Sequence, residues 1–74
     1  MDRPAELQIA ERNVEEGERL VAQQRQTVAR LRAGGHDSGI AERLLEKFEL
    51  SLQALTDHME LVRLELEEER PRRH

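Results

Sequence analysis

The side chains that could do chemistry are few, and most of them lie in the second half of the chain. Asp57 and His58 are adjacent, and a hydroxyl lies nearby on Ser51 or Thr56. Together they could suggest a hydrolytic triad. On a helix, however, these side chains would be spread around the axis, and no loop is available to form an oxyanion hole. We therefore predict no catalytic residues, no enzymatic activity and no small-molecule substrate.

The histidines do not form a metal site by their spacing. They are His36, His58 and His74. Metal ligands on one helix need an i, i+4 separation, but Ala54 and Val62 occupy those positions around His58. The chain has no cysteine, so it cannot form a disulfide or a thiolate metal site. We expect no metal and no cofactor.

A glycine-rich segment, residues 34–39, lies near the middle of the chain. It lacks the strand, lysine and hydroxyl spacing of a phosphate-binding loop. Its residues instead predict a turn between two helices. Gly34 or Gly35 can take the left-handed conformation that ends a helix. Asp37 or Ser38 can accept backbone N–H bonds where the next helix begins.

Apolar residues recur at alternating spacings of three and four on both sides of this turn, which is typical of a helix with one buried stripe. We call the two stripes together the seam. In the first half the seam comprises Leu7, Ala10, Val14, Gly17, Val21, Gln24, Val28 and Leu31. In the second half it comprises Ala41, Leu45, Phe48, Leu52, Leu55, Met59, Val62 and Leu66. Leu20 and Leu44 widen the two stripes.

The predicted fold is therefore all-α, an antiparallel two-helix hairpin of the coiled-coil type forming a single domain. Helices are expected at about residues 4–33 and 38–70, with a turn at 34–38 and a frayed tail at 71–74. Two helices of similar length joined by a short linker favour antiparallel packing. Because a chain of 74 residues with one aromatic residue rarely forms a robust core alone, we expect pairing into a dimeric four-helix bundle.

The second helix carries apolar residues that the seam does not use. Leu50, Ala54, Leu61 and Leu64, here called the outer row, lie on the face away from the seam, with Asp57 interrupting them. A row of exposed leucines indicates a contact surface for a second copy or for a helix of a partner protein. The alternative is ordinary surface leucine. We expect a homodimer, with a protein partner as a further possibility.

Three irregular positions at or beside the seam are candidates for specifying how the helices pair. Gly17 costs about 1 kcal/mol relative to alanine inside a helix. It indicates a close helix approach, for example against Leu55, or else a tolerated weak point. Gln24 could select the register or reach the edge of the seam. His58 could hydrogen-bond across the bundle and confer mild pH sensitivity.

The net charge of −4, from 12 basic and 16 acidic residues, argues against nucleic-acid binding. The alternative function is a small dimeric RNA- or DNA-binding regulator. It would require a cluster of arginines on one bundle face, aided by the arginines of the tail. The residues concerned are Arg25, Arg30, Arg32, Arg43, Arg70, Arg72 and Arg73.

No segment is apolar enough to span a membrane, and Met1-Asp2-Arg3-Pro4 lacks the pattern of a signal peptide. The expected location is cytoplasmic.

Part of the sequence resembles a known group of proteins. The residues concerned are Gly17, Gln24, Leu31, Gly35-His36-Asp37-Ser38, Ala41, Leu44-Leu45, Phe48-Glu49, Leu52 and His58. Over residues 10–62 the chain is similar to small uncharacterised helical-hairpin proteins of alphaproteobacteria. The resemblance implies a hairpin fold and a bacterial origin. It implies no activity and transfers no catalytic residues.

Overall fold

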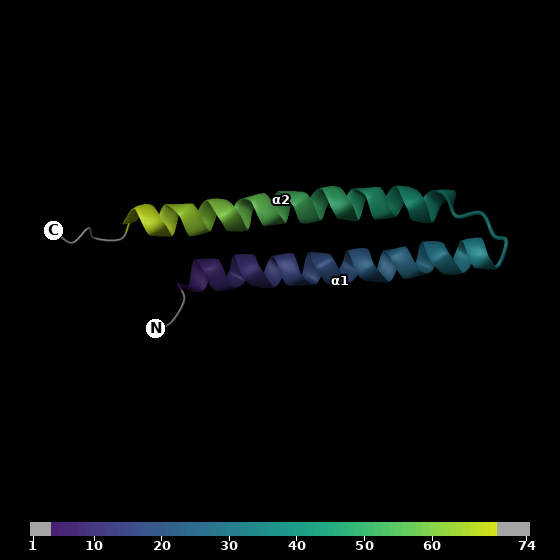
Figure 1. The fold of residues 1–74 in the computed structure, drawn as a ribbon, viewed down its shortest axis with the longest axis horizontal. Coiled ribbons are helices and arrows are strands. Elements are labelled where there is room, and N and C mark those ends of the chain that lie inside the picture. Colours follow the sequence, from purple (N-terminus) through teal and green to yellow (C-terminus); the bar gives the residue numbers. More distant parts are fainter. Residues whose placement is uncertain (1–3, 70–74) are drawn as a thin grey trace.

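Two long helices lying side by side make up almost all of the structure (Figure 1). The structure is a computed structural model, and it describes residues 4–69. Helix α1 spans Ala5–Ala33 and helix α2 spans Gly39–Glu69. The helices run in opposite directions and pack against each other along their length, and the described residues contain no strand. The prediction of an all-α two-helix hairpin is confirmed.

The core is one layer of side chains between the helices. Every residue of the seam is buried or half-buried, whereas most residues between seam positions are exposed. The most deeply buried apolar residues are Ala10, Val21, Val28 and Val62. None of the large side chains in the described region is fully buried. A hairpin of this size therefore leaves much of its seam partly open to water, as expected for two helices without a third layer.

Helix α1 ends in a Schellman motif formed by the two adjacent glycines. Gly35 adopts the left-handed conformation, with φ of 73°. The N–H of His36 donates to the Leu31 carbonyl at 2.8 Å, and the N–H of Gly35 donates to the Arg32 carbonyl at 3.1 Å. These bonds satisfy carbonyl groups that the end of a helix leaves unpaired. Gly35, and not Gly34, is thus the left-handed residue.

Helix α2 begins with two side chains that act together. Asp37 accepts a hydrogen bond from the N–H of Gly39 through Oδ1, at 2.9 Å. Ser38 is buried, and its hydroxyl bonds to the Glu42 carboxylate. Its carbonyl also accepts from the N–H of Glu42, at 2.8 Å. Of the two predicted capping residues, Asp37 accepts a backbone N–H through its side chain, whereas the Ser38 hydroxyl donates to Glu42 instead.

At the open end of the hairpin, backbone hydrogen bonds form the start of helix α1. Helix α1 is preceded by Pro4, whose carbonyl accepts from the N–H groups of Leu7 and Gln8. The predicted tail at 71–74, with His74, and the tail arginines Arg70, Arg72 and Arg73 lie outside the residues that the structure describes.

Glu42 links the turn to both helices electrostatically. The hydrogen bond from the Ser38 hydroxyl, and then the hydrogen bond from Arg32, lower the pKa of the Glu42 carboxyl below its ordinary value of 4.5. Because the folded pKa is depressed, the stabilisation from this carboxylate is present above about pH 4.5. It is lost as the pH falls through the folded pKa.

We therefore expect Glu42→Gln to lower the thermal unfolding midpoint at neutral pH. The difference between Glu42→Gln and the wild type should narrow well below pH 4.5, where the native carboxyl is also protonated. Circular dichroism melts of both proteins at the two pH values provide the measurement. A difference that stays constant with pH would show that the charge of Glu42 does not stabilise the turn.

Candidate interaction surfaces

The side chains considered for hydrolysis are not brought together. The Thr56 hydroxyl donates to the Leu52 carbonyl at 2.9 Å. Asp57 accepts a hydrogen bond from the Gln53 amide at 3.0 Å. His58 is exposed and takes no part in either bond. Within residues 4–69, no three His, Cys, Asp or Glu side chains cluster in a way that could hold a metal ion.

Gly17 lies where α1 comes closest to two leucines of α2. A Cβ atom built at Gly17 would lie 3.2 Å from Leu52 Cδ1 and 3.3 Å from Leu55 Cδ1. Both distances are shorter than ordinary van der Waals contact. The absence of a side chain at this position therefore lets the leucines of α2 pack against the backbone of α1.

Gln24 makes a hydrogen bond between the helices. Its Nε2 group donates to the carbonyl of Ala41 at 3.0 Å. This bond provides a partner for the donor group of a half-buried side-chain amide. Removing that donor from water without a hydrogen-bond partner would cost free energy. His58, the third candidate for pairing specificity, makes no hydrogen bond or ion pair in the described region.

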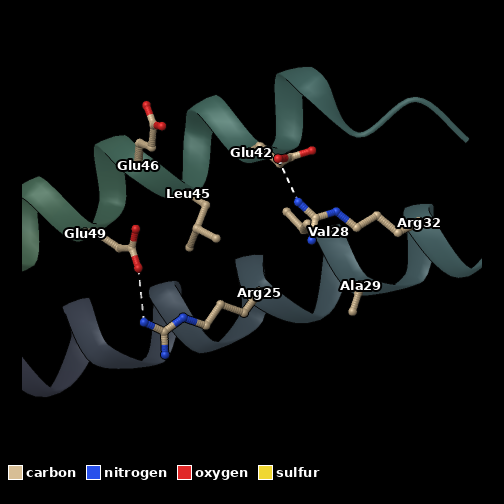
Figure 2. Close-up of a pocket in the computed structure, with 8 residues that line it drawn as sticks. All are labelled: Arg25, Val28, Ala29, Arg32, Glu42, Leu45, Glu46 and Glu49. Atoms are coloured by element: carbon tan, nitrogen blue, oxygen red, sulfur yellow. Dashed lines mark hydrogen bonds and ion pairs between the residues drawn. The ribbon is translucent and has the colours of Figure 1, made fainter.

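One long side of the hairpin is charged, and three ion pairs cross it. Arg25 and Arg32 of α1 reach Glu49 and Glu42 of α2 at 3.0 and 2.8 Å, on either side of a shallow hollow (Figure 2). A longer pair of 3.9 Å joins Arg63 to Glu11 near the open end. Each of these six residues directly follows a seam residue in sequence. We call this side the charged edge.

The ion pairs of the charged edge fix the register more than they stabilise the fold. Their side chains are largely exposed, and exposed pairs contribute about 0–1 kcal/mol each. Two of these ion pairs also involve arginines that the alternative function, nucleic-acid binding, would require. Arg25 and Arg32 are paired with acids on the charged edge, whereas Arg30 directly precedes a seam residue and therefore lies on the opposite side of the hairpin. These three arginines therefore do not form one basic face.

The opposite long side carries four exposed large apolar residues among polar ones. Ile9, Leu20, Ile40 and Leu44 are exposed there, and we call this side the apolar edge. Each of the four directly precedes a seam residue. Successive helical residues are about 100° apart, and the two helices are antiparallel. Residues before the seam therefore point to one side of the hairpin, and residues after it point to the other.

A hollow confirms that the two helices share this side. It has a volume of about 190 Å³ and is lined by Gly17 and Leu20 of α1 and by Phe48, Ser51 and Leu55 of α2, among others. The heptad pattern indicates Leu20 and Leu44 as apolar residues beside the seam but does not indicate Ile9 and Ile40. The signal that could have revealed them is their position one residue before the seam, which the heptad pattern alone does not single out.

The outer row of α2 faces away from α1. Leu50 is 72% exposed, and Leu61 and Leu64 are each 54% exposed. Ala54 and the interrupting Asp57 are also exposed. Leu61 directly precedes the seam residue Val62 and therefore borders the apolar edge as well.

No protein-family model matches the chain, and comparison with curated proteins and with solved structures finds no match. Neither described helix is long and apolar enough to cross a membrane.

Proposed function

We propose that the protein is a non-enzymatic structural or protein–protein interaction module that self-associates through α2. One observation carries this proposal. Of the seven large hydrophobic residues exposed in the described region, five lie on α2. They are Ile40, Leu44, Leu50, Leu61 and Leu64. Exposed apolar residues gathered on one element mark an interaction surface more often than the same residues scattered singly.

The thin core supports the same proposal. The chain exposes 6376 Å² of surface, whereas a compact monomer of its mass is expected to expose about 4,700 Å². Part of the difference follows from the elongated shape of a two-helix rod. Removing more of this surface from water by association would stabilise the fold. A second copy of the chain always supplies a matching surface, and symmetric pairs are the commonest oligomers.

Self-association should make stability depend on concentration. We expect the thermal unfolding midpoint of the wild-type protein to rise as its concentration is increased, because association binds the folded form and not the unfolded chain. Circular dichroism in cells of different path length covers the range needed. An unfolding midpoint that is the same at all concentrations would contradict the proposal.

A further inference from the structure

The apolar edge is a second surface, which adjoins the outer row at Ala54 and Leu61, and both helices contribute to it. Ile9 and Leu20 come from α1, and Ile40 and Leu44 come from α2. We infer that a second copy packs face to face on this edge, in antiparallel orientation, and forms a four-helix bundle. This inference rests on the proposed self-association. It adds a second contact, and Leu50 and Leu64 of the outer row, which do not precede seam residues, remain free for the association proposed above.

The dimensions of the edge suit such a contact. Helix α1 has 29 residues and is therefore about 43 Å long. The hairpin is 19 Å across, so one long face measures roughly 800 Å². A stable interface buries about 800 Å² on each partner. The edge also carries none of the ion pairs between helices that are found on the opposite side, so a partner would not have to break them.

The hollow beside Gly17 lies at the centre of the proposed contact. It lies near the middle of the rod, where Gly17 contacts Leu52 and Leu55. Its volume of about 190 Å³ is comparable to that of one large apolar side chain. Leu20, which is 41% exposed, lies at its rim. A two-fold axis across the middle of the rod brings Leu20 of each copy to the hollow of the other, as a knob fits a hole between helices.

The charges that flank the apolar edge select the antiparallel orientation. Among the residues that precede seam positions, the acidic Glu6 and Glu65 lie at the open end. The basic Arg30 and Lys47 lie toward the turn. In the antiparallel arrangement α1 packs on α1 and α2 packs on α2, so Glu6 approaches Arg30 of the other copy and Glu65 approaches its Lys47. Glu16, which also precedes a seam residue and lines the hollow, approaches its own counterpart near the two-fold axis. This one like-charge contact is outnumbered by the four opposite-charge contacts. The parallel arrangement places α1 on α2 and brings like charges together, which is unfavourable.

The test separates the two surfaces with paired substitutions. The edge pair is Ile9→Glu with Ile40→Glu; the two isoleucines are 57% and 78% exposed, so their replacement leaves the packing between the helices in place. The outer pair is Leu50→Glu with Leu64→Glu, which do not border the edge. Sedimentation equilibrium compares the wild-type protein, the two double variants and the quadruple variant that combines them. Circular dichroism checks that each protein remains helical.

We expect the average mass of the wild-type protein to exceed that of a dimer at high concentration. Each double variant should reach the mass of a dimer and no more, and the quadruple variant should remain at 8.6 kDa. An outer pair that is monomeric and helical at every concentration would overturn the inference and leave the proposed function intact. An outer pair that matches the wild type would instead show that the outer row does not self-associate. A monomeric wild type would overturn both.

A distance measurement tests the orientation. Because the chain has no cysteine, a single Ala33→Cys substitution in the outer pair places one spin label near the turn of each copy. Antiparallel packing about the middle of α1 separates the two labels by about 40 Å, from a rise of 1.5 Å per residue. Parallel packing would bring them to below about 30 Å, and that result would overturn the antiparallel assignment. A matched label at Ala22, which is near the middle of the rod and off the apolar edge, gives a shorter distance than Ala33 in the antiparallel dimer.

Discussion

Replacing Leu61 and Leu64 by glutamate is expected to weaken self-association by at least about 100-fold, which is about 2.7 kcal/mol. Both leucines are half-exposed in the hairpin, and burying such side chains is worth about 1 kcal/mol or more each. In a symmetric contact every substitution occurs twice. The effect is large also because Leu61 belongs to the outer row and borders the apolar edge. Sedimentation velocity over a concentration series measures the change.

The matched control adds the same charge to a face that neither surface uses. Ala22→Glu with Gln26→Glu places two carboxylates on exposed positions of α1 that do not precede a seam residue. We expect this variant to associate like the wild type. If both variants weaken association equally, the cause is overall charge and not the leucines. If the Leu61 and Leu64 variant loses its helices, these leucines belong to the core of the hairpin itself.

Placing a charge in the seam should unfold the hairpin. Val21 is 4% exposed and lies between the helices, so the carboxylate of Val21→Glu would be buried without a partner. Such a charge destabilises a protein by about 3–5 kcal/mol, which approaches the whole stability of a small domain. We expect Val21→Glu to lose most of its helical signal at 25 °C in circular dichroism, or to melt far below the wild type.

The neighbouring residue provides the control for this prediction. Ala22 is exposed on α1, and Ala22→Glu adds the same charge one position further along the same helix. The cost there is limited to a few tenths of a kcal/mol of helix propensity. A Val21→Glu protein that melts within a few degrees of Ala22→Glu would contradict the packing of the seam.

The helices, the seam and the turn could be predicted because they depend on local properties of the sequence. Apolar spacing defines the buried stripe, and Gly34-Gly35 interrupts two patterns that would otherwise be continuous. The seam predicted at residues such as Val21 and Val62 is buried in the structure. A Cβ atom built at Gly17 would lie 3.3 Å from Leu55 Cδ1, one of the residues that the seam pattern placed opposite it.

Features that depend on the relative placement of the helices could not be predicted in the same way. The hydrogen bond from Gln24 to the Ala41 carbonyl and the pair between Arg25 and Glu49 both require a particular register. The heptad pattern identifies a stripe but not its two sides. It therefore gave Leu20 and Leu44 as extensions of the seam, without showing that Ile40 joins them on one edge.

The measurement that tests the central claim most directly is the mass of the wild-type protein in solution as a function of concentration. Sedimentation equilibrium gives this mass independently of molecular shape, which matters for an elongated hairpin. Self-association through α2 predicts an average mass that rises well above 8.6 kDa across the micromolar range, with helical content retained. A protein that is fully helical and remains at 8.6 kDa at high micromolar concentration would contradict the proposal.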